Sequence, residues 1–124
     1  YAEVLADRKY ERVRASAPMQ LGLMETDLTP SFAIVPDRDG RLNDLAVTLS
    51  ITNNGSEPVT LQAFAMAPGY PREQAPVSNL GPGEAAIRRF LFPGGAERLM
   101  GKRIRVGLIE VSGTGRLNRS LFIQ

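Results

Sequence analysis

The chain has 124 residues, a formal net charge of +2 and 43% hydrophobic residues. This length suits one globular domain with a single core, and the small charge argues against nucleic-acid binding through overall charge. Cysteine and histidine are both absent. Their absence excludes disulfides, thiolate chemistry and the imidazole groups that most often act as general bases or as zinc and copper ligands. We therefore predict that the chain is not an enzyme and holds no cofactor or metal.

Residues 1–17 differ from the rest because they contain no glycine or proline and are rich in Ala, Glu, Arg and Lys. This composition favours a short helical segment, either an exposed helix or the end of a membrane helix that exits into basic residues. No apolar run approaches the ~20 residues that cross a bilayer, and no signal-peptide pattern is visible. The chain begins at Tyr1 and not at methionine. We interpret it as processed or as a piece of a longer chain, with residues 1–17 as a lead-in or linker and 18–124 as a β-sandwich domain.

The clearest strand signal lies in residues 45–66, which read L-A-V-T-L-S-I-T, N-N-G-S-E-P and V-T-L-Q-A-F-A-M. Apolar residues alternate with polar ones on both sides of an Asn-Asn-Gly reversal, which predicts one central hairpin. Further strands are expected over residues 19–24, 32–35, 77–80, 85–92, 103–111 and 117–123. We expect a break at residues 29–30, an irregular proline-rich loop over 67–76 and one helical turn over 96–100.

About seven short strands with no helices between them indicate an all-β fold. We predict an antiparallel immunoglobulin-like or cupredoxin-like β-sandwich with a short N-terminal helical segment. The predicted core contains the apolar residues that alternate along these strands: Leu21, Leu23, Val47, Leu49, Ile51, Val59, Leu61, Ile104, Val106, Leu108, Leu121 and Ile123.

Two kinds of segment look like ligand-binding loops, and turn chemistry explains both more simply. Residues 37–44, D-R-D-G-R-L-N-D, resemble a calcium loop but lack a third early ligand and the later bidentate glutamate. Residues 81–83 and 113–115 are glycine-rich, yet neither opens a helix after a strand, so a phosphate cradle is not expected.

The most suggestive surface consists of arginines near the C-terminus. From residue 88 onward, eight basic residues accompany only two acids, Glu97 and Glu110. One interpretation is a solvated sheet face that resists edge aggregation. The other is a partner surface for an acidic protein, lipid headgroups or a polysaccharide. Nucleic acid is not expected, because no aromatic residues are interleaved with the arginines. The candidate partner surface is formed by Arg103, Arg105, Arg116 and Arg119.

Two resemblances to known families follow from the order of these motifs. I-T-N-N-G-S-E-P at 51–58, followed by L-G-P-G-E at 80–84, resembles bacterial immunoglobulin-like accessory modules. The chain also resembles the soluble C-terminal cupredoxin-like domain of the B subunit of copper membrane monooxygenases, the particulate methane and ammonia monooxygenases. The stretches that carry this second resemblance are R-K-Y at 8–10, A-P-M-Q-L-G at 17–22, the strand and turn at 49–61, Phe64, P-G-E at 82–84, A-E-R-L at 96–99, G-L-I at 107–109 and G-R at 115–116.

The resemblance to the monooxygenase subunit implies a packing and assembly domain on the outer side of a membrane, outside the active site. The copper-binding histidines of that subunit lie in its other soluble domain, and none has a counterpart here. The chain departs from the family at Ala96, where the family has an aromatic residue, and in its short middle loop.

We therefore expect a non-catalytic, extracytoplasmic β-sandwich module, in the periplasm or cell envelope. It would pack against other subunits or domains of a larger, membrane-associated assembly, with its N-terminus near the membrane. The alternative is an accessory immunoglobulin-like domain that binds an anionic glycan or lipid through its arginines. An enzyme or metal protein built on carboxylates is the rival class, and stoichiometric metal in the purified domain would indicate it.

Overall fold

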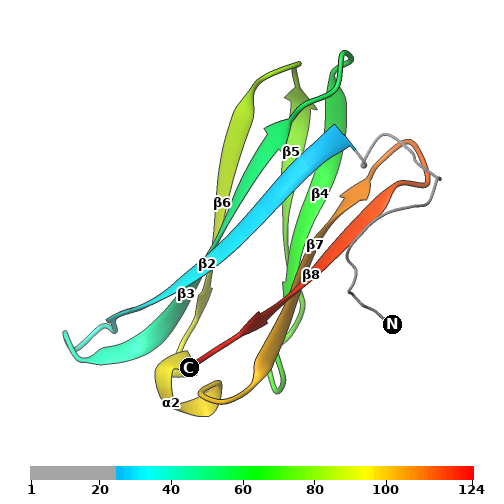
Figure 1. Cartoon of the computed structure of the whole chain (residues 1–124). Helices are drawn as coiled ribbons and strands as arrows, with labels where there is room; N and C mark the ends of the chain where they lie inside the picture. Colours follow the sequence, from blue (N-terminus) through cyan, green and yellow to red (C-terminus); the bar gives the residue numbers. More distant parts are fainter. Residues whose placement is uncertain (1–24) are drawn as a thin grey trace.

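The computed structural model describes residues 25–124, which form seven antiparallel β-strands and one short helix (Figure 1). The strand orders in the two sheets are β2-β3-β6 and β5-β4-β7-β8. The elements are β2 (Thr26–Pro36), β3 (Leu42–Asn53), β4 (Val59–Met66), β5 (Glu73–Leu80), β6 (Ala85–Phe92), α2 (Gly95–Arg98), β7 (Arg103–Glu110) and β8 (Arg116–Phe122).

The predicted all-β sandwich is confirmed by these two sheets. The strand over 85–92 and the helical turn near 96–100 are also confirmed. The expected N-terminal helix, the strand over 19–24 with Leu21 and Leu23, and the boundary at residue 18 lie outside the described residues. No helix among residues 25–124 is long and apolar enough to cross a membrane.

The core lies between the two sheets and contains most of the predicted residues. Alternate residues of β3 and β7 are fully buried, because their period of two turns one set of side chains toward the opposite sheet. Each such side chain contributes roughly 1.5–3 kcal/mol to stability. Val59 and Leu121 are only partly buried. The core also includes residues that we did not predict, from β5, β6 and the segment after α2: Val77, Leu80, Phe90, Phe92 and Leu99.

The predicted hairpin over residues 45–66 is wrong. β3 pairs with β2 and β6, whereas β4 pairs with β5 and β7, so the two strands belong to opposite sheets. Leu49 and Leu61 are both fully buried and meet the same core from opposite sides. Residues 54–58 therefore form an arch between the sheets, and not a turn within one sheet.

The buried side chain of Asn53 holds this arch in place. Its Nδ2 donates to the carbonyl oxygens of Glu57 (2.8 Å) and Leu80 (2.9 Å), and its Oδ1 accepts from the Gly55 amide (2.8 Å). The Asn53 residue is only 2% exposed. One amide thus joins the end of β3, the arch and the end of β5 across the sandwich.

We expect Asn53→Ala to lower the free energy of unfolding by about 2–3 kcal/mol, because it leaves buried backbone groups without partners. Urea unfolding followed by circular dichroism measures this loss. Asn54→Ala is the matched control. The Asn54 amide makes an exposed bond to Asp27 Oδ2 (2.6 Å), so its loss should cost less than about 1 kcal/mol. Equal losses in the two variants would contradict this role for Asn53.

One expected interruption is absent and another is shorter than expected, because proline is tolerated at sheet edges. Pro30 does not break the chain: β2 runs through it, with Pro30 opposite Leu49, and lies at the sheet edge as predicted for residues 32–35. The loop expected over 67–76 ends earlier. β5 begins at Glu73, and Pro76 pairs with Gln62 of β4.

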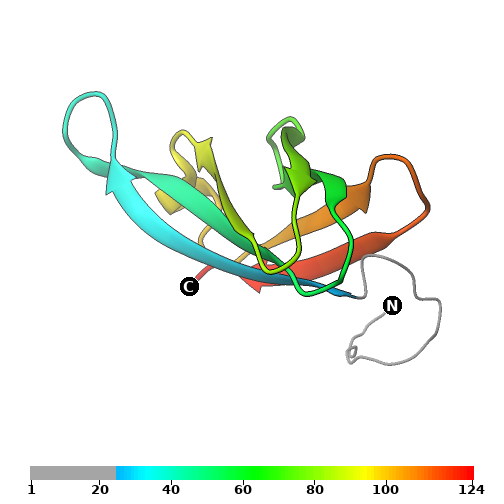
Figure 2. The same cartoon turned by 90° about the horizontal axis from the view of Figure 1, so that it is seen from above.

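The strand order resembles an immunoglobulin constant domain with one strand moved. In that domain the fourth strand joins the sheet of the first, second and fifth strands, whereas here β5 joins β4, β7 and β8. Seen from above, β2 and β8 border one side of the sandwich, and β5 and β6 border the other (Figure 2). The outer face of the four-stranded sheet carries three of the four predicted arginines.

Candidate partner-binding surface

Three of the four predicted arginines lie on the outer face of the β5-β4-β7-β8 sheet. Arg103 and Arg105 are exposed, while the residues that alternate with them are buried. Arg105 lies beside Met66 of β4 and Ser120 of β8 in the strand register. Arg116 lies opposite Ile109, which has the same parity as Arg105, and therefore projects from the same face.

Arg119 does not belong to this face. It lies opposite the buried Val106, so its side chain leaves β8 on the inner side of the sheet. Because β8 is an edge strand, this position is still exposed. Its guanidinium Nη1 donates to the carbonyl oxygen of Asn118 (3.1 Å). The expectation that all four arginines share one surface is therefore wrong.

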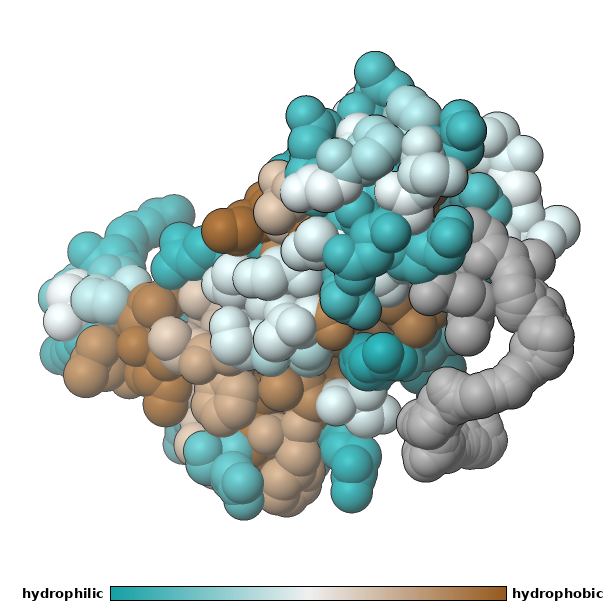
Figure 3. Space-filling model, turned by 45° about the horizontal axis from the view of Figure 1, so that its top comes forward, coloured by the Kyte–Doolittle hydropathy of each residue, from teal (hydrophilic) through white to brown (hydrophobic). Residues whose placement is uncertain are grey.

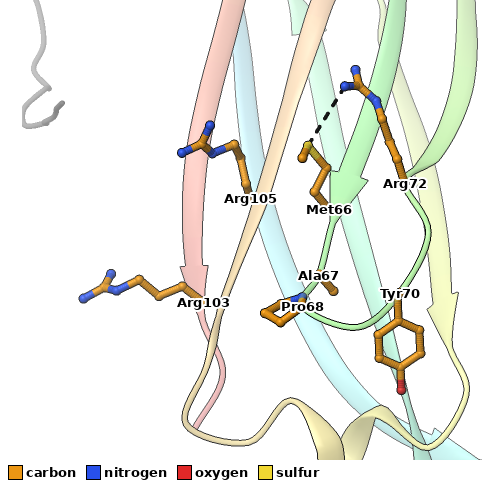
Figure 4. Close-up of a pocket in the computed structure, with 7 residues that line it drawn as sticks. All are labelled: Met66, Ala67, Pro68, Tyr70, Arg72, Arg103 and Arg105. Carbon is orange, nitrogen blue, oxygen red and sulfur yellow. Dashed lines mark hydrogen bonds between the residues drawn. The ribbon is translucent and has the colours of Figure 1, made fainter.

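A fourth arginine, which we did not predict, completes the surface. Arg72 lies in the short connection between β4 and β5, and with Arg103 and Arg105 it borders a hollow of about 320 Å³. In Figure 4, Met66 lies between the side chains of Arg105 and Arg72, and Arg103 extends outward. The Nη1 of Arg72 is 4.0 Å from the sulfur of Met66. The full lining is Met66, Ala67, Pro68, Tyr70, Arg72, Arg103 and Arg105.

Aromatic rings support the cations around this hollow. The guanidinium of Arg72 lies 4.5 Å from the centre of the Phe64 ring, and that of Arg103 lies 5.4 Å from the Phe122 ring. These distances fit cation–π contacts, which restrict where a guanidinium points. The pairing of β7 with β8 thus brings Phe122 to Arg103, and the β4–β5 connection returns Arg72 over Phe64, so the premise that no aromatic residues accompany the arginines is wrong. Phe64 is only 5% exposed, however, and offers no open ring face to a nucleobase.

Tyr70 forms the floor of the hollow at the end nearest α2. Its hydroxyl donates to the carbonyl oxygen of Pro93 (2.5 Å), and its ring packs edge-to-face on the Phe92 ring, with 5.2 Å between the ring centres. The guanidinium of Arg98, the last residue of α2, lies 5.2 Å from the Tyr70 ring. Tyr70 therefore links the β4–β5 connection to α2 and gives the hollow a fixed floor.

No carboxylate neutralises these cations in the described part of the chain. Arg72, Arg98, Arg103 and Arg105 form no ion pair with any of residues 25–124. Like charges held close together repel, and an anionic group that forms charge-assisted hydrogen bonds with them relieves this repulsion. The surface is therefore suited to an anionic partner.

The other candidate loops are held by local hydrogen bonds. In residues 37–44, Asp37 Oδ1 accepts from the amides of Asp39 (2.8 Å) and Arg41 (3.1 Å), which is ordinary turn chemistry. Glu84 accepts in the same way from the Gly81 amide (2.6 Å). Among residues 25–124, no group of three or more acidic, histidine or cysteine side chains could hold a metal ion.

Comparison with known proteins assigns no family. No protein-family model matches the chain, and no curated protein matches it at significant similarity. The resemblances to immunoglobulin-like accessory modules and to the monooxygenase B subunit therefore stay predictions.

Proposed function

We propose that this chain is a non-catalytic, extracytoplasmic module that packs against another protein of a larger assembly. The binding surface is the outer face of the β5-β4-β7-β8 sheet. The observation that carries the proposal is the set of three arginines, Arg72, Arg103 and Arg105, around one hollow without an acidic partner among the described residues. Arginine, methionine and aromatic residues are enriched in protein interfaces, and this hollow combines them.

The extracytoplasmic, membrane-associated setting depends on the sequence resemblance to the monooxygenase subunit. In that setting the N-terminus lies near the membrane, and the β-sandwich meets the other subunits or domains. The partner presents an acidic patch, because the module supplies cations and no carboxylates within the hollow.

An anionic glycan or lipid is the alternative ligand of the same surface. It is favoured by the exposure of Arg103 and Arg105 and by Phe122, which is 42% exposed beside them. The hollow favours a protein partner, because Met66, Pro68 and Tyr70 give it an apolar lining against which a protein side chain of matching shape can pack.

The double variant Arg103→Glu/Arg105→Glu tests whether these arginines form the binding surface. We expect the full chain to bind poly-L-glutamate with an affinity that falls as salt rises, and the double variant to bind at least about tenfold more weakly. The matched control is Arg38→Glu/Arg41→Glu, which makes the same charge change at exposed positions of the β2–β3 turn. This control should bind within about twofold of wild type, since its charges lie on the other sheet.

Parallel titrations use heparin and vesicles of phosphatidylglycerol and phosphatidylcholine. Binding to heparin or vesicles without binding to poly-L-glutamate would favour the alternative function. No binding to any of the three, or an equal loss in the control variant, would contradict the proposal.

A further inference from the structure

We propose that β8 is the site where an extended acidic segment of the partner adds a strand to the β5-β4-β7-β8 sheet. This inference rests on the proposed function and names how the partner binds. Strand addition combines backbone hydrogen bonds, which give affinity, with alternate side chains, which give specificity. Three observations support it: outward-facing backbone groups without a partner strand in residues 25–124, a β8 without proline or register irregularity, and the side chains on the two sides of β8.

The backbone groups of alternate β8 residues point away from β7. The Ile123 amide donates to the Lys102 carbonyl (3.0 Å), and the Gly101 amide donates to the Ile123 carbonyl (2.7 Å). At the other end, the Glu110 amide donates to the Gly115 carbonyl (2.9 Å). Because bonding direction alternates along an antiparallel pair, the intervening odd-numbered residues also bond to β7. The residues whose amide and carbonyl groups face outward are then Arg116, Asn118, Ser120 and Phe122.

Those outward groups are largely available in the described part of the chain. β8 has a single neighbouring strand, β7, in its sheet. The carbonyl of Asn118 accepts the exposed bond from the Arg119 side chain, which an incoming amide would replace. The chain thus offers a row of donors and acceptors over the length of β8.

Each of the other three edge strands carries a proline, a register irregularity or a side-chain tie that hinders strand addition, whereas β8 is protected by the charged side chain of Arg119 on its inner side. β2 contains Pro30 and Pro36. β5 contains Pro76 and a register irregularity opposite β4, near Asn79 with its positive φ of 53°. β6 is tied to β5 by the bond from Arg88 Nε to the Pro76 carbonyl (2.9 Å). β8 has no proline, and its register with β7 is continuous, so it is the edge best suited to strand addition.

The two sides of β8 define the side chains of the added strand. On the outer side Arg116 flanks the new position, and Arg103 and Arg105 lie one strand further in. This side favours aspartate or glutamate at alternate positions. On the inner side, the added strand borders Arg119 and apolar residues that remain partly exposed where the sandwich opens between β2 and β8: Phe32, Ile34, Leu117 and Leu121.

The exposed apolar area on this side is visible in Figure 3, where brown and tan side chains gather beside the β2–β3 hairpin. Ile34 of β2, on the inner face of its strand, is 39% exposed. The occupant that fits is therefore an extended segment with acidic residues alternating with apolar ones. A second copy of this chain fits less well, because pairing β8 with β8 would bring the arginines of both strands together.

The probe is the capped heptapeptide Glu-Val-Glu-Val-Glu-Val-Glu, with Lys-Val-Lys-Val-Lys-Val-Lys as its control. On the full chain, we expect the acidic peptide to slow amide hydrogen exchange at Asn118 and Ser120, and the basic peptide to leave it unchanged. Ser120→Pro removes an outward amide and no bond to β7, so it should keep the fold and weaken peptide binding by about tenfold or more. Ser120→Ala, which retains the amide, should bind like wild type.

Each contrary outcome has a distinct meaning. The inference is overturned if poly-L-glutamate binds through Arg103 and Arg105 while the β8 amides gain no protection, and the proposed function then stands. If the chain also failed to bind poly-L-glutamate, both this inference and the proposed function would be overturned. The inference would also be overturned if the amides of β8 were already protected without peptide. Light scattering would then identify what covers the edge: a dimer would indicate a second copy of the chain, and a monomer would indicate residues 1–24. Should Ser120→Pro fail to fold, the exchange measurement on wild type decides alone.

Discussion

Replacement of Val47 by aspartate is expected to unfold the domain. Val47 is fully buried at the centre of β3, and the strand register places it between Phe32 of β2 and Phe90 of β6. Neither residue opposite Val47 in the register is a cation, and burying an unpaired charge costs several kcal/mol. That cost is comparable to the whole stability of a small domain, about 5–15 kcal/mol. Circular dichroism at 25 °C should show loss of the β signal.

The neighbouring residue provides the control. Thr48 has the opposite parity and lies on the outer face of the sheet, opposite Ser31 and Arg89. Thr48→Asp should change stability by less than about 1 kcal/mol. A folded Val47→Asp variant, or an unfolded Thr48→Asp variant, would contradict the assignment of inner and outer faces to β3. Val47 is a sharper site for this test than Leu49, because Leu49 lies opposite Arg88, which could pair with a new carboxylate.

Substitution of Gly107 by alanine is the second change with a large expected effect. A β-carbon at Gly107 would collide with the carbonyl oxygen of Leu117 and lie 2.6 Å from Cζ of Phe64. Gly107 thus allows the Phe64 ring to lie flat on the outer face of the sheet, directly opposite it in the register. We expect Gly107→Ala to lower the free energy of unfolding by about 3 kcal/mol, at the upper end of overpacking costs. Urea unfolding measures the change.

The matched control is Gly81→Ala. A β-carbon at Gly81 would meet only the side chain of Glu84, at 3.0 Å from its Oε1, and this flexible side chain can move away. The control should lose less than about 1 kcal/mol. If Gly107→Ala were as stable as Gly81→Ala, the close packing of Phe64 on β7 would be wrong, and with it the position of Arg72 over the ring.

The sequence predicts which residues of each strand face the core but not which strands pair. The alternation in residues 45–66 is the same whether two strands lie side by side or face each other across a core. The pairing of β3 and β4 with different strands distinguishes the arch from a turn, and the buried Asn53 amide, which reaches Leu80 in a distant segment, holds the arch in place. The rule that proline interrupts a strand fails at residues 30 and 76, because edge positions cannot be recognised before the pairing of the strands is known.

The candidate surface was partly predictable for the same reason. Arg103 and Arg105, two residues apart on one strand, had to share a face. Arg116 and Arg119, three residues apart, had to lie on opposite faces, and the parity alone could have excluded Arg119. Arg72 could not be found from the sequence, because it reaches the surface only through the pairing of β4 with β5 and β7. The Phe122 ring beside Arg103 likewise comes from the pairing of β7 with β8, whereas the Phe64 ring lies under Arg72 because the β4–β5 connection turns back over β4.

The proposed function requires that the outer face of the β5-β4-β7-β8 sheet binds an acidic protein segment. The most direct test maps the amide chemical shifts of the full chain during titration with poly-L-glutamate. We expect shifts confined to β4, β7, β8 and the β4–β5 connection, centred on Met66, Arg72 and Arg105 and suppressed by added salt. Shifts centred on the β2-β3-β6 sheet, or no shifts at low salt, would contradict it.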